Sequence, residues 1–228
     1  MTSTIFHGLL PLIILGVGIV VVMLQIAWRR HAGITLGLAL VTLIMAIAVL
    51  SQSLAMDPLG ATPLLMVDGL SRLMSLVLLL GALATLLLAD RWLQWREAES
   101  GEFSLLLLLA TLGTIVMVHS QHAASFVLGL EILGVSMYTL IAYPQRHAIS
   151  VEAGLKYLVL SSASTGMLLF GMALLYAATG ALAFTDVGQR LTSADTVLIT
   201  AATVLMVAGM AFKLSLVPFH MWTPDVYE

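Results

Sequence analysis

The chain has 228 residues, of which 61% are hydrophobic and only 9% are charged, and its formal net charge is −3. A water-soluble domain needs more charged residues to cover its surface, so this composition excludes a soluble globular protein and indicates an integral membrane protein. The small net charge gives no support for nucleic-acid binding. Because cysteine is absent, disulfides and cysteine-ligated zinc or iron–sulfur sites within the chain are excluded as well.

Seven apolar stretches are long enough for transmembrane helices, which need about 20 residues each. Their apolar residues run continuously, without the alternation that a membrane β-barrel requires. Polar segments separate them, and the segment 180–194 carries apolar residues at the spacing of a short surface helix. The sequence therefore predicts an all-α, polytopic transmembrane helix bundle, with spans at residues 5–28, 33–55, 69–90, 103–119, 122–142, 151–179 and 195–217.

Arginines in the loops predict an orientation, because cytoplasmic loops of membrane proteins are enriched in basic residues. The loops after odd-numbered spans contain Arg29, Arg30, Arg91, Arg96 and Arg146. The opposite side offers only Arg72 and Arg190, each close to an aspartate. We therefore expect the N-terminus outside and the odd-to-even loops in the cytoplasm. The four tryptophans at the edges of spans, Trp28, Trp92, Trp95 and Trp222, are predicted to be interfacial anchors.

Three ionisable residues remain within or near the predicted spans: Glu131, Lys156 and Lys213, of which the last two are the only lysines in the chain. A charged side chain at the bilayer centre costs about 3 kcal/mol. Glu131 lies near the middle of its span, and it is either a neutral carboxylic acid bonded to a neighbouring helix or a site that binds and releases a proton. The second interpretation is favoured, because intramembrane carboxylates commonly belong to ion or proton pathways.

Lys156 follows Glu152 by four residues, so the two side chains share one face of a helix. A structural salt bridge with a snorkelling lysine and a place on a proton path are both consistent with this spacing. The polar run SSAST follows at residues 161–165. Such a run is typical of close helix packing, and also of a wet interior that conducts protons.

Lys213 stands at the end of the last apolar stretch, five residues before Pro218. Proline has no amide hydrogen, so the carbonyl of Leu214 lacks its helical donor and the helix is expected to break there. At membrane depth such a break is tolerated where it is buried in protein or lines a cavity. A lysine beside it could load and release a proton, with an interfacial lysine at a helix end as the alternative. His220, just past the proline, is a candidate relay.

Two further features concern the histidines of the fourth loop and the chain end. His119 and His122 could in principle bind metal or haem, but no partner histidines on other helices are apparent, so we predict no metal site. Residues 223–225, TPD, predict the start of another helix with Thr223 as its N-cap. A chain end only a few residues later is expected of a fragment or a truncated product of a longer chain.

Residues 212–228, FKLSLVPFHMWTPDVYE, resemble the signature of the antiporter-like membrane subunits of proton-pumping NADH–quinone oxidoreductase, respiratory complex I. The signature is a lysine followed by PFH and then W-x-P-D. The subunit N branch of that family is the most similar. Residues 101–143 and 150–165 resemble its fourth to sixth helices, and residues 20–31 and 56–73 resemble its N-terminal part.

This resemblance implies a fold of about fourteen helices, built around two inverted repeats, in chains about twice as long as this one. The present sequence would hold the first seven helices of that fold. Residues 1–100 would form an N-terminal three-helix segment. Residues 101–228 would form an incomplete first antiporter-like repeat, whose last helix is broken at Pro218.

The resemblance also implies that Glu131, Lys156, Lys213 and His220 carry protons through the membrane, coupled to quinone reduction in partner subunits. NADH, FMN, iron–sulfur clusters and quinone are then expected on those partners, with no cofactor and no metal in this chain. The enzymatic activity would belong to the assembly. The expected setting is the cell inner (plasma) membrane, in contact with lipid and with other membrane subunits, including sister antiporter-like subunits, and without nucleic acid.

Two other functions stay open at this point. The related multisubunit cation/proton antiporters share the pattern of a lysine followed by PFH, although the first three helices resemble subunit N. A scaffold that anchors a complex in the membrane without transport is the second alternative. Two lysines and a mid-span glutamate count against the scaffold.

Overall fold

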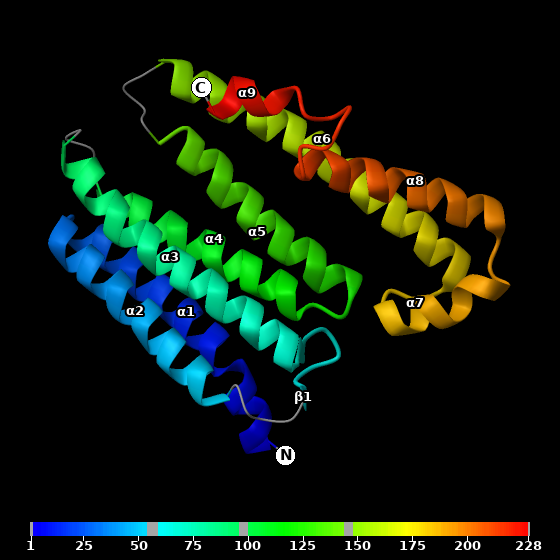
Figure 1. Ribbon diagram of the computed structural model, residues 1–228, viewed down its shortest axis with the longest axis horizontal. Coiled ribbons are helices and arrows are strands. Elements are labelled where there is room, and N and C mark those ends of the chain that lie inside the picture. The colour runs from blue at the N-terminus through cyan, green and yellow to red at the C-terminus, as the bar shows by residue number, and fades with distance from the viewer. Residues whose placement is uncertain (1, 54–58, 96–99, 144–147, 228) are drawn as a thin grey trace. The chain divides into compact units, whose positions relative to one another are not determined.

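The computed structural model describes residues 2–53, 59–95, 100–143 and 148–227 (Figure 1). Within these residues, seven helices are long and apolar enough to cross a membrane, which confirms the predicted architecture of a multi-pass helical protein. They are α1 (Thr2–Trp28), α2 (Ala32–Ser53), α3 (Gly69–Trp95), α4 (Ser100–His119), α5 (Ala123–Ile141), α6 (Ala148–Thr179) and α8 (Thr196–Lys213). Arg96 and Arg146, on which the predicted orientation partly depends, lie outside the described residues.

The shorter elements connect the long helices. Two-residue strands β1 (Leu59–Gly60) and β2 (Met66–Val67) pair antiparallel before α3. After α6 come the short helix α7 (Phe184–Arg190) and the 3₁₀ turn η1 (Leu191–Ser193), in the segment where a surface helix was predicted. The last helix, α9 (Trp222–Tyr227), follows α8 after an irregular segment.

By their contacts the residues divide into two compact units. The first contains residues 1–120 and 128–137, and the second contains residues 121–127 and 138–228. In the first unit, α1 to α4 pack around one apolar core whose residues recur at helical spacing, as an apolar helix face requires. Its fully or almost fully buried members include Leu15, Val22, Leu43, Leu50, Leu79, Leu86, Leu108 and Ile115.

The first unit continues into α5 through a close glycine contact. A Cβ atom added at Gly113 of α4 would lie 2.7 Å from the carbonyl oxygen of Gly129, and one added at Gly129 would lie 2.7 Å from the carbonyl oxygen of Gly113. Such backbone proximity requires residues without side chains. Gly129 is two residues from Glu131, so this contact sets the position of that part of α5 within the unit.

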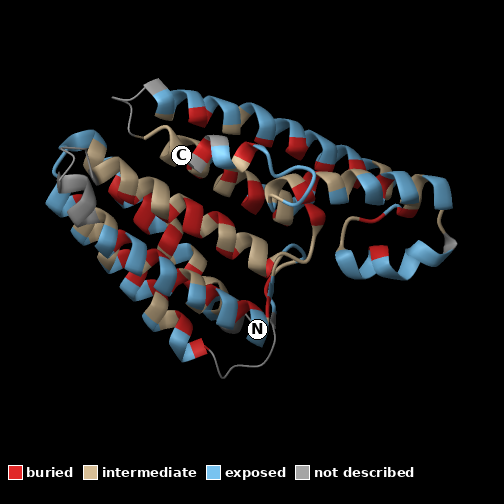
Figure 2. Ribbon diagram, turned by 45° about the horizontal axis from the view of Figure 1, so that its top comes forward, coloured by how far each residue is buried: buried red, intermediate tan, exposed pale blue. Residues whose placement is uncertain are grey.

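In the second unit, α6 and α8 lie side by side over most of their length, and α9 packs on α6 (Figure 1). Figure 2 shows that many residues of the helices are exposed, and many of these are large and apolar. Val159, Phe170, Val197 and Val204 are examples in this unit. Such surfaces are costly in water and favourable in lipid, which agrees with a membrane-embedded chain.

Asp68 begins α3 through a reciprocal cap. Its Oδ1 accepts a hydrogen bond from the amide of Ser71 at 2.7 Å, and the Ser71 hydroxyl accepts one from the amide of Asp68 at 2.9 Å. This is a capping box, in which each side chain satisfies an amide that the helix leaves without a partner. Because the Ser71 amide bonds the carboxylate, the pKa of Asp68 lies below its ordinary value.

We expect Asp68→Ala to lower the free energy of unfolding at pH 7 by about 1 kcal/mol, the usual value of an N-cap. A depressed pKa stabilises the fold above the unfolded-state pKa of about 3.9, and this stabilisation is lost as the pH falls through the folded-state pKa. The difference between the variant and the wild type should therefore shrink below about pH 4. Thermal unfolding in detergent across this range measures it, and Asp68→Asn, which keeps the capping oxygen, should stay close to the wild type.

Candidate functional site

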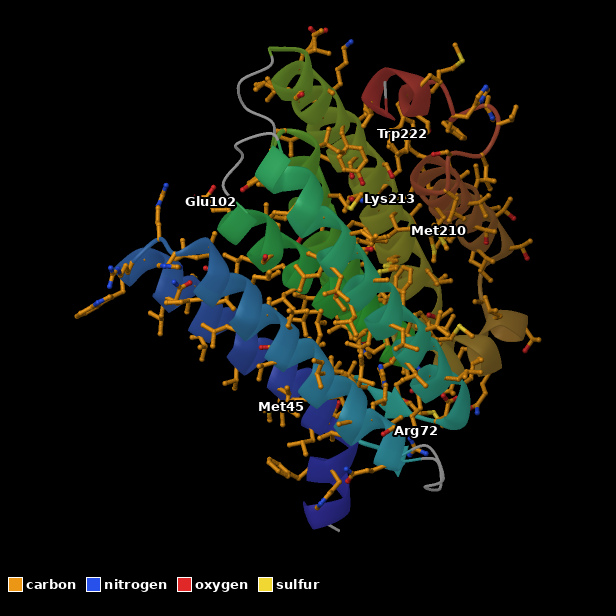
Figure 3. All side chains as sticks on the ribbon, turned by 60° about the vertical axis from the view of Figure 1, so that its left-hand side comes forward. Met45, Arg72, Glu102, Met210, Lys213 and Trp222 are labelled. Carbon is orange, nitrogen blue, oxygen red and sulfur yellow. The ribbon has the colours of Figure 1, made fainter. Side chains whose placement is uncertain are left out.

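Lys213 is the last residue of α8, and its ammonium group points to α6 in the second unit. Its Nζ donates a hydrogen bond to the hydroxyl oxygen of Ser161 at 2.9 Å. Ser161 is buried, and Lys213 is half-buried. Figure 3 shows Lys213 beside α6, close to Trp222. The lysine that the sequence singled out therefore has a specific hydroxyl partner on the neighbouring helix.

The backbone after Lys213 explains why the helix ends there. The amide of Leu216 bonds the carbonyl of Ala211 at 2.9 Å, and the amide of Ser215 bonds the carbonyl of Phe212 at 3.0 Å. With φ of 53° at Ser215, these are the bonds of a Schellman motif, in which a left-handed residue closes the helix. The predicted break beside Lys213 is confirmed. The helix ends at the left-handed turn of Ser215, at a position where glycine is usual. Pro218 follows three residues later.

Trp222 covers this helix end. Its Nε1 donates to the carbonyl oxygen of Phe212 at 3.1 Å, and its ring stacks on the Phe212 ring with centroids 5.3 Å apart. The ring of Tyr157 from α6 also contacts Trp222, and the centroids of these two rings are 5.2 Å apart. Only 8% of Trp222 is exposed. The prediction that Trp222 is an interfacial anchor is therefore wrong, because tertiary contacts bury its ring against α6 and α8.

Thr223 also differs from its prediction. The last helix begins at Trp222, one residue before the expected N-cap. The Thr223 hydroxyl donates to the Ser215 hydroxyl at 2.7 Å, so it ties α9 to the turn that ends α8. The helix predicted at the chain end is present, but this threonine does not cap it.

Small residues bring α6 and α8 together at this site. A Cβ added at Gly209 would lie 2.8 Å from the backbone oxygen of Ser164, and one added at Gly171 would lie 2.8 Å from the backbone oxygen of Ala202. The Ser164 hydroxyl donates to the carbonyl of Gly209 at 2.8 Å. Of the two interpretations of the run 161–165, close helix packing is thus confirmed at Ser164, while the hydroxyl of Ser161 is used by Lys213.

Lys156 lies on a different side of α6. Its Nζ forms an ion pair with Glu152 Oε1 at 3.0 Å, with 46% of the lysine side chain exposed. The salt bridge expected from the spacing is therefore present. Ser161, which bonds Lys213, is five residues further along α6, so its side chain points about 140° away from that of Lys156 around the helix axis. A role for Lys156 in proton transfer stays a prediction.

Glu131 and His220 occupy very different surroundings. Glu131 is partly buried in the part of α5 that belongs to the first unit. The side chain of His220 is exposed on the segment between α8 and α9, and its carbonyl accepts the amide of Thr223 at 3.1 Å. The structure places His220 near the turn that ends α8 but gives it no buried position.

A buried polar group at the start of α3 was missed by the sequence analysis. Arg72, taken there as a loop residue, is in α3 and only 1% exposed. His119 is buried in the same unit, with its Nδ1 2.9 Å from the carbonyl oxygen of Ile115. The signal that could have identified this group is the arginine four residues after a helix cap.

The two histidines considered as metal ligands each make a local hydrogen bond. His119 bonds its own helix, and His122 caps α5, since its Nδ1 accepts the amide of Ala124 at 3.1 Å. Among the residues that the structure describes, no group of three His, Cys, Asp or Glu side chains could hold a metal ion.

Comparison with known proteins shows what this chain is similar to. Residues 120–228, which include α5 to α9, match the NADH:quinone oxidoreductase/Mrp antiporter transmembrane family. A chain of respiratory complex I from Thermus thermophilus is 33% identical and superimposes with a TM-score of 0.80, over 95% of this chain and 47% of that one. The chain thus has the fold of about half of an antiporter-like subunit.

Two other solved structures share this fold at lower identity. A chain of the membrane-bound sulfane sulfur reductase, an archaeal respiratory membrane complex, is 19% identical with a TM-score of 0.85, over 96% of this chain and 47% of that one. A chain of the Mrp complex from a Dietzia species is 20% identical with a TM-score of 0.77, over 97% and 43%. At these identities the likeness is one of fold alone, and this chain spans about half the length of each of the three chains named here.

Proposed function

We propose that this chain, an antiporter-like membrane subunit whose residues 120–228 belong to the NADH:quinone oxidoreductase/Mrp antiporter transmembrane family, carries protons within a NADH–quinone oxidoreductase. The observation that supports it most is the Lys213 ammonium at the end of a broken membrane helix, bonded to the neutral hydroxyl of Ser161. A higher identity to the complex I chain, 33% against 20% for the Mrp chain, favours this assembly over an antiporter.

The pairing of Lys213 with a hydroxyl suits a group that gains and loses a proton. A serine hydroxyl accepts a hydrogen bond from an ammonium group, and it can turn to donate one to the neutral amine. Ser161 can thus stabilise both protonation states of Lys213.

Within this proposal, Lys213 receives a proton and passes it on when the surroundings of the helix end change. Glu131 and Lys156 are proposed as further proton-carrying groups on α5 and α6, and His220 as an exposed group where protons can enter or leave. The redox cofactors would be held by partner subunits, in a plasma membrane with the N-terminus outside. The second candidate is a subunit of a multisubunit cation/proton antiporter, favoured by the fold shared with the Mrp chain.

The test is NADH-driven proton uptake in inverted membrane vesicles that contain the assembled complex. Lys213→Met and Glu131→Gln should each reduce the rate of proton uptake at least about tenfold, since the loss of one charged partner commonly exceeds 1.4 kcal/mol. Subunit assembly, measured by native electrophoresis, should be unchanged. Normal uptake in both variants would contradict the proposal and favour a scaffold. A gradient that responds to sodium and not to NADH would favour the antiporter.

Ser161 and its neighbour Ser162 test whether the hydroxyl that bonds Lys213 takes part in proton transfer. Ser161→Ala removes a hydrogen-bond acceptor of Lys213, and proton uptake should fall about tenfold, the effect of losing one hydrogen bond to a charged group. Ser162→Ala removes the same atom from the adjacent, exposed position of α6 and should leave uptake unchanged. Equal rates in the two variants would show that the Ser161 hydroxyl has no part in transfer.

A further inference from the structure

A cavity of about 170 Å³ lies in the first unit, where the ends of α1, α2 and α4 meet. Its polar lining consists of Arg30, His31, Thr35 and Glu102, and Ile26 supplies an apolar wall. None of these residues belongs to the proposed proton path. Figure 3 shows Glu102 near the beginning of α4. The cavity therefore requires a separate explanation.

The position of the cavity along the helices indicates what is available to fill it. The membrane-spanning part of α1 ends at Trp28, and those of α2 and α4 begin at Ala32 and Gly101. The cavity thus lies where the hydrocarbon of a bilayer gives way to the lipid head groups. Trp28, 93% exposed, is at the same level, as expected of a tryptophan at this boundary. Phospholipid head groups are the molecules present there at high concentration.

The charges of the lining are of both signs. Arg30 Nη2 lies 3.4 Å from Glu102 Oε1, and both side chains are partly open to solvent. A guanidinium group binds phosphate oxygens well, with several N–H donors in a fixed plane. A carboxylate binds a primary ammonium group, which has N–H donors, better than a quaternary one, which has none. The amide ends of α2 and α4 face the same region and add partial positive charge.

We propose that this cavity binds the head group of a phospholipid that carries a primary amine. Arg30, with His31 beside it, binds the phosphate, and Glu102 binds the ammonium group. A purely basic pocket would select an anionic lipid, whereas Glu102 repels a second negative charge and offers an acceptor to an amine. The proposal concerns a lipid site and is independent of proton transport.

The experiment uses the purified complex in detergent, stripped of lipid and then exposed to equal amounts of phosphatidylethanolamine, phosphatidylcholine and phosphatidylglycerol. Native mass spectrometry measures how much of each lipid the subunit retains. In the wild type we expect phosphatidylethanolamine to be retained about tenfold better than either of the others, the effect of one charge-assisted hydrogen bond. Equal retention of all three lipids, or a preference for phosphatidylglycerol, would overturn the proposal.

Three variants locate the site. Glu102→Gln should abolish the preference for phosphatidylethanolamine over phosphatidylcholine and should raise retention of phosphatidylglycerol. Arg30→Gln should lower retention of all three lipids. Arg29→Gln removes the same charge from the neighbouring residue, which does not line the cavity, and should behave like the wild type. If Arg29→Gln and Arg30→Gln had equal effects, the binding would be an effect of surface charge and the site would be wrong.

Discussion

Gly209→Ala should destabilise the packing of α6 against α8, although it adds a single methyl group. A Cβ at this position would lie 2.8 Å from the backbone oxygen of Ser164 and 3.1 Å from the backbone nitrogen of Leu168. Backbone atoms in the middle of α6 cannot move aside as a flexible side chain could, so the helices must separate. The separation would also weaken the bond from the Ser164 hydroxyl to the carbonyl of Gly209. Overpacking of this kind costs about 1–3 kcal/mol.

Gly166→Ala is the matched control, because the same substitution in α6 meets open space. No atom lies within 4 Å of the position that its Cβ would take. Alanine is a better helix former than glycine by about 1 kcal/mol, so this variant should be slightly more stable than the wild type. Thermal unfolding in detergent measures both variants. Effects of equal sign would show that the close contact at Gly209 does not control the packing of α6 and α8.

Trp222→Ala should give the largest loss of stability among these variants, because it removes the side chain that packs over the end of α8. The indole ring is buried, stacks on Phe212 and contacts Tyr157. Removal of a buried aromatic side chain costs about 3–5 kcal/mol, which includes the cavity that remains. The loss should free α9 from α6 and open the region around Lys213 to solvent. Unfolding in detergent and hydrogen exchange of the amides of α9 measure the two consequences.

Two control variants separate the effect of burying the Trp222 ring from the effect of its hydrogen bond. Trp28→Ala removes the same side chain from a position that is 93% exposed and should change stability in detergent by less than about 0.5 kcal/mol. Trp222→Phe keeps an aromatic ring against Phe212 and removes the Nε1 donor to its carbonyl. It should cost about 1 kcal/mol, the net contribution of one hydrogen bond. A Trp222→Ala variant as stable as Trp28→Ala would contradict the buried position.

The spans were predictable because the bilayer imposes a length. The final span was expected to reach residue 217, whereas α8 ends at Lys213. The missing amide of Pro218 located the break correctly at Leu214, since the loss of a donor acts four residues earlier. What the local sequence did not reveal is the left-handed turn at Ser215. A serine tolerates that conformation here because its hydroxyl accepts the bond from Thr223 and its amide bonds the carbonyl of Phe212.

The candidate site was predictable only in part. Lys213 was identified because a charge in an apolar stretch is costly and therefore rare. Its partner was not, since Ser161 and Ser162 are equivalent in sequence and only the packing of α8 selects one of them. Trp222 was misjudged for the same reason: a tryptophan near a span end is usually an anchor, and only contacts with Tyr157 and Phe212 bury it. Arg72 was missed because its burial depends on neighbouring helices.

The sequence by itself determined that this is a multi-pass membrane protein, which segments are long and apolar enough to cross a bilayer, and that Glu131, Lys156 and Lys213 lie within them. These properties depend on the composition and order of neighbouring residues, because transfer of each segment into lipid is a local free energy. The tertiary structure decided which hydroxyl meets Lys213, which tryptophan is buried and which glycines touch. Those contacts join residues that are far apart in the sequence, such as Ser161 and Lys213, 52 positions apart. An apolar helix can face lipid on every side, so its own sequence does not fix which helix it packs against. The close fit of small residues between helices decides the pairing.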